Sequence, residues 1–262
     1  MLSFLFVISL FVLVISSCTI LYYHPMPNCI DWLWACMKMH YSQTLWVVVI
    51  IMEAIGIGSL LYLCYMCIKT NFVIRELLKW KTNEYESQVI CMFQSKYSVQ
   101  IQVVKHHLPL AFTHGFIKPS ILISTELVAL LQSDELEAVL EHEYYHCIRR
   151  DPLKLSMWLS LTRVCSFLPV SQKLFRGYVA KREIAADAFA IRQIGVKAVA
   201  SALYKLLANG SPPTFAMVHF GNNSFQNTSI RINALLEGTY QQERIPVLDW
   251  IKSFFYLFLQ CF

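Results

Sequence analysis

Charged side chains are scarce in this 262-residue chain. Only 15% of its residues are Asp, Glu, Lys or Arg, and 56% are hydrophobic. A soluble globular domain carries about 25% charged residues. The composition therefore excludes a disordered chain, a collagen-like chain and an ordinary cytosolic enzyme, and it indicates that much of the chain lies in lipid.

A disulfide framework is also missing. The nine cysteines are odd in number and unevenly spaced, which does not favour systematic pairing. Cys64 and Cys67 form a CxxC inside an apolar run, where they are expected to act as small hydrophobic residues. Cys29 and Cys36 share a short loop and can pair only if that loop faces an oxidising compartment.

The net charge of +5 does not indicate nucleic-acid binding. The basic residues are not gathered on a polar domain but flank apolar stretches, as Lys69, Arg75, Lys79 and Lys81 do. Such placement is the signal of membrane topology. We expect no direct contact with nucleic acid.

Two segments near the start are long and apolar enough to cross a bilayer. Residues 1–23 hold no charged side chain, and no Lys or Arg precedes Lys38, so the basic region of a cleaved signal is missing and a retained anchor is expected. Residues 45–68 form the second span, interrupted by Glu53. One interpretation is that this carboxyl has a function in the membrane. The alternative is that it is protonated and neutral, or that it faces the protein interior or the headgroups. Residues 1–69 are thus predicted to form two transmembrane helices with a short external loop.

The distribution of Lys and Arg predicts the orientation of these helices. The loop 24–43 carries only Lys38, whereas residues 69–81 carry four basic residues. Positive residues stay in the cytoplasm, so the chain from Lys69 onward is expected to begin there, in a multi-pass protein of the cell membrane. Residues 245–262 are a candidate C-terminal membrane helix, although Asp249 and Lys252 interrupt them.

Between these regions the sequence predicts a small α+β domain. Residues 99–105 alternate polar and apolar side chains as a half-buried strand does, and residues 110–112 and 121–124 are two shorter strand candidates. Ser124 is a candidate N-cap for a helix through Leu131. Ser133 begins another helix, with Asp134 and Glu135 at the positive end of its dipole.

This second helix carries the motif HExxH at residues 142–146. Positions four apart share one face of a helix, so His142 and His146 can present two imidazoles to one metal ion. Glu143 lies close enough to act as general base toward an attacking water. The residue types predict one Zn²⁺ per chain. The alternative is a solvated helix with two ordinary histidines.

A catalytic zinc site needs a third protein ligand. The Ala-rich segment 181–190 has no Gly or Pro and should be helical. Its Glu183 and Asp187 are four residues apart and share a face, so one can bind the metal while the other holds a ligand histidine. The alternative is an amphipathic helix with two solvated acids.

HExxH followed by Arg-Arg-Asp-Pro and a downstream ExxxD resembles the integral-membrane zinc peptidases of the BlaR/MecR-type antirepressor family. The related HtpX/Ste24-type peptidases share this signature. Further similar segments lie at residues 111–119, 134–140, 229–232 and 235–236. The resemblance spans about residues 70–240 and implies a cytoplasm-facing gluzincin domain, hence a mainly α membrane protein with a small α+β zincin-like metallopeptidase domain and several transmembrane or re-entrant helices.

The resemblance also implies roles for single residues. His142, His146 and Glu183 would bind zinc, Glu143 would be the general base and Asp187 would orient a ligand. Arg231 lies in the similar Arg-Ile element, which makes it a candidate transition-state stabiliser. The other candidate donors are His106, His107, Tyr178, Arg182 and His219.

The proposed ligands constrain the topology. If residues 155–170 crossed the membrane once, His146 and Glu183 would lie on opposite sides and could not share an ion. We therefore expect residues 153–180 to dip into the membrane and return as a hairpin that turns near Pro169.

Three functions remain open from the sequence. The first is a zinc endopeptidase that cuts a protein or peptide substrate, which by the family resemblance could be a DNA-binding transcriptional repressor in a signalling pathway. The second is a quality-control protease for membrane proteins. The third is a catalytically silent membrane sensor or scaffold. The sequence does not indicate an oligomeric state.

Overall fold

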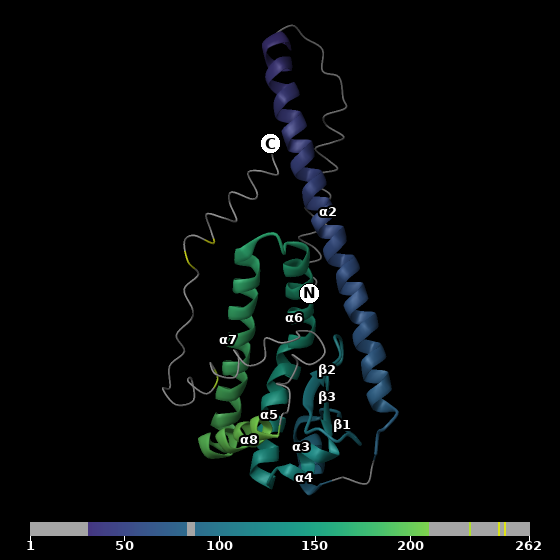
Figure 1. The fold of residues 1–262 in the computed structure, drawn as a ribbon, viewed down its shortest axis with the longest axis vertical. Helices are drawn as coiled ribbons and strands as arrows, with labels where there is room; N and C mark the ends of the chain where they lie inside the picture. Colours follow the sequence, from purple (N-terminus) through teal and green to yellow (C-terminus); the bar gives the residue numbers. More distant parts are fainter. Residues whose placement is uncertain (1–30, 83–86, 210–230, 232–245, 247–248, 250–262) are drawn as a thin grey trace. The chain divides into compact units, whose positions relative to one another are not determined.

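The computed structural model describes residues 31–82, 87–209, 231, 246 and 249. The expected first span (1–23) and almost all of the candidate C-terminal helix (245–262) lie outside the described residues. The chain forms two compact units, residues 1–50 and 51–262, and the second contains the predicted site. The described part is mainly helical, with one small sheet (Figure 1).

The first described helix is longer than the expected second span. Helix α2 runs from Asp31 to Leu78, so the loop expected at 24–43 is helical from Asp31 onward. No Gly or Pro lies between residues 59 and 82, which explains why the helix continues past the apolar run. Within α2, residues Ile50–Leu78 are long and apolar enough to cross a membrane, and few side chains of this stretch are fully buried. Among the described residues this is the single such helix.

After α3 (Gln88–Tyr97) the chain forms three short strands, close to the segments expected at 99–105, 110–112 and 121–124. They are β1 (Ile101–Val104), β2 (Ala111–His114) and β3 (Ser120–Ser124), in the order β1-β3-β2. Strand β1 is parallel to β3, and β2 is antiparallel to it. Gly115 permits the turn between β2 and β3, because its φ is +92° and a Cβ there would lie 2.7 Å from the Lys118 carbonyl oxygen.

The sheet is covered on both faces. The short helix α4 (Thr125–Leu130) begins at the expected N-cap Ser124, and α5 (Ser133–Arg149) follows. Apolar residues of α5 pack with Ile121 and Ile123 in the main core. On the opposite face Phe112 and Leu122 pack against Leu77 and Leu78, at the end of α2.

The segment that follows α2 extends the sheet beside β1. The Thr82 N–H donates to the Val103 carbonyl at 3.0 Å, and the Lys105 N–H donates to the Trp80 carbonyl at 2.8 Å. Among the described residues this leaves β2 as the outer strand on the other side.

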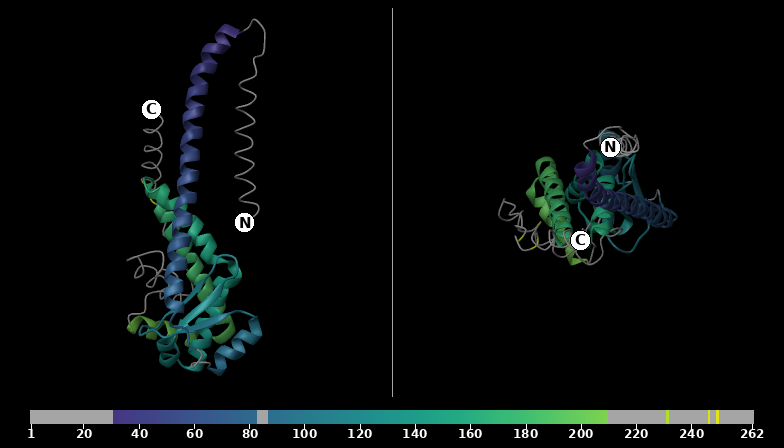
Figure 2. Two further views of the ribbon diagram at one scale, coloured as in Figure 1. Left: turned by 90° about the vertical axis from the view of Figure 1, so that its right-hand side faces the viewer. Right: turned by 90° about the horizontal axis from the view of Figure 1, so that it is seen from above.

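Two antiparallel helices follow α5. They are α6 (Asp151–Val164) and α7 (Pro169–Ile194), joined by a short turn at residues 165–168, and they lie side by side in both views (Figures 1 and 2). The turn between them directly precedes Pro169, the first residue of α7. Leu155, Leu159 and Phe175 of this hairpin pack around Met66 of α2.

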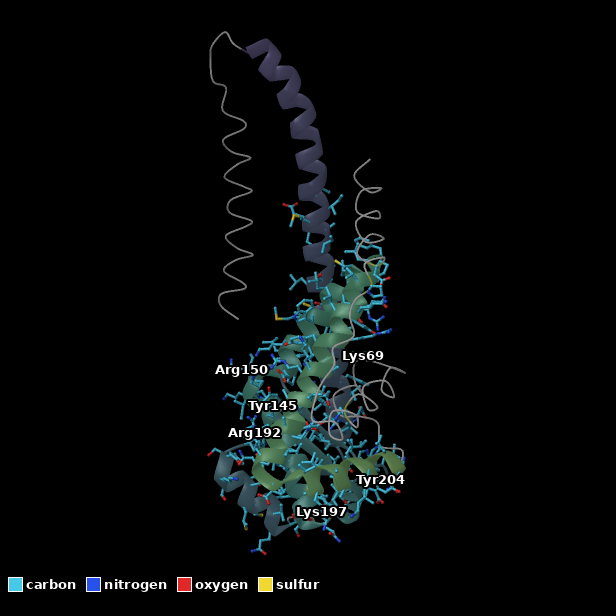
Figure 3. All side chains as sticks on the ribbon, turned by 90° about the vertical axis from the view of Figure 1, so that its left-hand side faces the viewer. Lys69, Tyr145, Arg150, Arg192, Lys197 and Tyr204 are labelled. Carbon is cyan, nitrogen blue, oxygen red and sulfur yellow. The ribbon has the colours of Figure 1, made fainter. Side chains whose placement is uncertain are left out.

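Helix α8 (Val196–Ala208) closes the domain after Gly195. Figure 3 shows Lys197 and Tyr204, both from this helix, at the end of the domain. Glu135 at the start of α5 accepts hydrogen bonds from Lys205 Nζ at 2.7 Å and Ser201 Oγ at 2.5 Å, and these contacts join α5 to α8.

Candidate metal centre

Three buried side chains from two helices converge on one point. His142 and His146 come from one face of α5, and their Nε2 atoms are 3.3 Å apart. Glu183 comes from α7, with its carboxylate oxygens 3.6 Å from His142 Nε2 and 3.7 Å from His146 Nε2. These residues form the one group among the described residues that is arranged to hold a metal ion.

The spacing of these atoms fits a small tetrahedral cation. Zinc binds His nitrogen and carboxylate oxygen at about 2.0–2.2 Å, which places neighbouring ligand atoms of a tetrahedron about 3.3–3.6 Å apart. The distances between the ligand atoms lie at or just above this range. Two imidazoles and one carboxylate also form the ligand set of known zinc peptidases.

Each imidazole is oriented by a second carboxylate. His142 Nδ1 lies 2.9 Å from Asp187 Oδ1, and His146 Nδ1 lies 2.9 Å from Asp151 Oδ2. A carboxylate accepts a hydrogen bond from Nδ1–H, which leaves the Nε2 lone pair available for a metal. Asp187 is the residue for which the family resemblance implies a role in orienting a ligand, and it contacts the candidate ligand His142.

Asp151 is a site residue that the sequence reasoning did not assign. It stands in the Arg-Arg-Asp-Pro segment that forms part of the family resemblance, and its position just beyond the helix with HExxH is the signal in the sequence that points to it. Arg150 adopts a left-handed conformation with φ +51°, which ends α5 and turns the chain so that Asp151 at the start of α6 faces back to His146. Figure 3 shows Arg150 and Tyr145 on the same side of the domain.

Glu143 is held by the sheet and keeps one oxygen free. Thr113 Oγ1 of β2 lies 2.9 Å from Glu143 Oε2 and 2.8 Å from the Glu143 carbonyl oxygen, so its single proton bonds one of them or is shared. Glu143 is 1% exposed, and its Oε1 is buried without a hydrogen-bond partner. A buried acceptor of this kind normally has a partner, and a water molecule at the site would provide one.

Arg231 binds the carboxylates around the ligands. Its Nε donates to Asp187 Oδ2 at 2.8 Å and its Nη2 to Asp187 Oδ1 at 2.7 Å, while Nη1 lies 3.4 Å from Glu183 Oε2. Sequence reasoning placed Arg231 as a candidate transition-state stabiliser. The structure brings it to the site, but its donors bind Asp187 and Glu183, which supports a role in positioning them.

The electrostatics of the site depend on paired charges. Burial disfavours the charged form of His142, but its hydrogen bond to Asp187 and its close contact with the Glu183 carboxylate outweigh burial and raise its pKa to about 9. Burial likewise opposes ionisation of Glu183, yet the close contact with His142 and the charges of His146 and Arg231 lower its pKa to about 2. The Asp187 pKa is also lowered, against the effect of burial, mainly by Arg231. The site thus stabilises positive charge between its carboxylates.

The other candidate donors do not meet at this point. His106 and His107 stack on each other in the loop after β1. Tyr178 and Arg182 contact each other near Asp151. His219 lies outside the described residues.

The fold and the site together define a membrane-associated metallopeptidase. Residues 33–235 match the sequence profile of the BlaR1 peptidase M56, and the chain belongs to this family. The matched range includes the predicted metal ligands, the predicted general base Glu143 and both Asp residues that contact the imidazoles. No curated protein matches the chain.

Proposed function

We propose that this protein is a zinc-dependent endopeptidase of the cell membrane that cleaves a protein substrate on the cytoplasmic side. The observation that carries the proposal is the convergence of His142, His146 and Glu183 with the adjacent Glu143, whose Oε1 is buried and unpartnered. A carboxylate in this state is suited to accept a proton from an attacking water.

The proposed chemistry assigns a task to each side chain. When bound, zinc supplies Lewis-acid polarisation of the scissile carbonyl and of the attacking water. Glu143 accepts the proton of that water on Oε1 and then delivers it to the leaving amine. Thr113 holds the other oxygen of Glu143 so that Oε1 keeps its direction. Asp187 and Asp151 keep the Nε2 atoms of the two histidines aimed at one point.

The helical hairpin supports the proposed topology. Because α6 and α7 are antiparallel, His146 and Glu183 lie at the same end of the hairpin. Its apolar residues pack on Met66, inside the apolar stretch of α2, which favours a hairpin that reaches the membrane. Arg163 and Arg176 are exposed on it, so their charged ends would extend to the headgroups or to water.

The substrate proposed from the family resemblance is a DNA-binding repressor, so the protein would act as an antirepressor in a signalling pathway. In this proposal the peptidase touches the repressor and not its DNA.

The first test measures zinc per chain for the purified full-length protein and for His146→Ala, with circular dichroism to check that both are folded. We expect about one zinc in the wild type and its loss in the variant. Glu143→Gln should keep the zinc and lose cleavage, and it then serves as a trap for the substrate. Zinc binding with no effect of Glu143→Gln on any proteolysis in cells would favour a silent sensor, and no zinc in the wild type after reconstitution would refute the proposal.

A further inference from the structure

The carboxylate that orients His146 has one oxygen without a hydrogen bond. Asp151 is 1% exposed, and its Oδ2 is 2.9 Å from His146 Nδ1, within hydrogen-bond distance. Its Oδ1 is buried and accepts no hydrogen bond. The cation that faces this oxygen is Arg182 of α7, whose Nε is 3.7 Å away.

Arg182 is held in place by aromatic residues of the hairpin. Its Nε and Nη2 donate to Tyr178 Oη at 3.2 and 3.0 Å, and its guanidinium lies 5.2 Å from the centre of the Tyr178 ring. Tyr178 in turn stacks on Trp158 of α6, with ring centres 5.8 Å apart and an interplanar angle of 27°. A continuous series of contacts thus runs from the hairpin through Arg182 and Asp151 to His146.

We propose that Arg182 is a positioning residue that fixes the Asp151 carboxylate on His146, so that the packing of Tyr178 against Trp158 in the hairpin controls how tightly the site holds zinc. The inference rests on the proposed zinc peptidase function. It assigns Arg182 and Tyr178 a role other than that of donors to the transition state.

The Asp151 carboxylate is almost fully buried, and a buried carboxylate is costly unless a cation lies nearby. Arg182 faces Oδ1 while Oδ2 contacts His146 Nδ1, so the two partners together fix the carboxylate and direct Nε2 to the metal. Without Arg182 the carboxylate is free to turn toward water, and His146 loses the group that orients it.

The position of Arg182 in the sequence strengthens the argument. It directly precedes the proposed ligand Glu183 on α7, while Asp151 begins α6, one residue after the end of the helix that carries His142 and His146. The ion pair therefore joins α7, which supplies Glu183, to the start of α6, close to the end of the helix that supplies the two histidines. Replacement of an outer residue that orients a metal ligand costs about 10- to 100-fold in affinity or activity.

The test measures the zinc dissociation constant of the full-length protein in detergent by competition with a chromogenic chelator. Arg182→Gln should weaken zinc binding about 10-fold, at the lower end of that range because Arg182 acts through Asp151. Arg182→Lys keeps the charge but loses the planar donors, so its affinity should lie between those of the wild type and Arg182→Gln. Tyr178→Phe keeps the stacked ring and removes the oxygen that Arg182 binds, and it should also weaken zinc. Lys181→Gln is the matched control, because this neighbouring cation on α7 is exposed, and its affinity should equal that of the wild type.

A double-mutant cycle separates positioning from a general loss of stability. In an Asp151→Asn background, Arg182→Gln should have no further effect on the zinc dissociation constant, because the group through which it acts is gone. The absorption spectrum of the Co²⁺-substituted protein should change in Arg182→Gln and in Asp151→Asn, and not in Lys181→Gln.

Three outcomes would overturn the inference. If the wild type binds zinc and Arg182→Gln binds it equally well, Arg182 has no positioning role and the peptidase proposal stands. If the effects of Arg182→Gln and Asp151→Asn simply add, Arg182 does not act through Asp151. If the wild type binds no zinc, the peptidase proposal fails and this inference fails with it.

Discussion

At the scale of single residues, the hydrogen bond from Thr113 to Glu143 deserves the first test. Thr113→Val removes the hydroxyl while keeping a similar volume, so Glu143 loses the group that fixes Oε2. We expect kcat to fall about 10-fold, the lower end of the effect of residues that orient catalytic groups, with zinc content unchanged. Peptide cleavage kinetics alongside metal analysis would measure this.

The control for this prediction is Thr113→Ser, which keeps the hydroxyl and should retain most of the activity. Unchanged kcat in Thr113→Val, with the protein folded and loaded with zinc, would show that the orientation of Glu143 does not depend on the sheet.

Residue spacing predicted part of the site and could not predict the rest. His142, Glu143 and His146 lie within one stretch of helix, so helical geometry alone places them together. Thr113 and Asp151 contact the same residues from other elements. Thr113 is 30 positions from Glu143 along the chain. Only the packing of β2 against α5 brings it there, and no local pattern encodes that packing.

At the scale of elements, Glu135 joins α5 to α8 through a pH-dependent contact. Burial would raise the pKa of Glu135, but the hydrogen bonds from Lys205, Ser201 and the Gln132 N–H outweigh it and lower the pKa. A lowered folded-state pKa means that the stabilising effect is present above the unfolded-state pKa of about 4.3 and is lost as the pH falls through the folded-state pKa.

We therefore expect Glu135→Gln to lower the melting temperature at pH 7 and to make progressively less difference as the pH falls below about 4. Thermal unfolding of wild type and variant, both stripped of metal, measures that difference without interference from zinc. A gap in melting temperature that stays constant down to pH 3 would contradict the linkage.

The outer strand β2 is the second element with a testable role. The Ser124 N–H donates to the Leu110 carbonyl, and in an antiparallel ladder this bonding alternates, so Ala111 and Thr113 direct their N–H groups away from β3. An extended substrate could pair with this edge. Ala111→Pro removes one outward N–H and should raise KM several-fold while zinc binding persists.

Phe112→Pro makes the matched comparison for this strand. Its N–H faces β3, so this change should disrupt the sheet and lower stability. If Ala111→Pro leaves both KM and kcat unchanged in a folded protein, the substrate does not pair with β2.

At the scale of the whole molecule, the orientation in the membrane can be read from one natural cysteine. Cys91 is exposed on α3, outside the apolar stretch of α2. In a variant in which the other eight cysteines are replaced by serine, a membrane-impermeant maleimide should label Cys91 only after the cells are permeabilised.

A cysteine placed at Lys38 in the same background gives the opposite control, since the basic-residue pattern predicts that this region lies outside. Labelling of Cys91 in intact cells would place the domain on the outer side and refute the cytoplasmic site.

The sequence predicted the elements of the domain better than their extents. The alternation at 99–105 and the two short candidates at 110–112 and 121–124 lie at the three strands, and the turn between α6 and α7 directly precedes Pro169. Helix α2 extends beyond the expected span 45–68 at both ends, because hydropathy marks only the apolar run, whereas the helix continues through polar residues that have no breaker among them. The order of the strands was not predicted, because strand pairing depends on contacts far apart in sequence.

The continuity of α2 into the domain has a mechanical consequence. Between residue 51 and Leu78 the helix has no break, its last residues pack on the sheet, and the next segment bonds to β1. No flexible linker lies between the helix and the sheet to absorb a rotation of the helix or a shift along its axis. Such a movement either carries the sheet with it or separates Leu77 and Leu78 from Phe112, a neighbour of Thr113. The proposed general base Glu143, which contacts Thr113 of the same sheet, is thus coupled to the helix whose apolar stretch is long enough to cross a membrane.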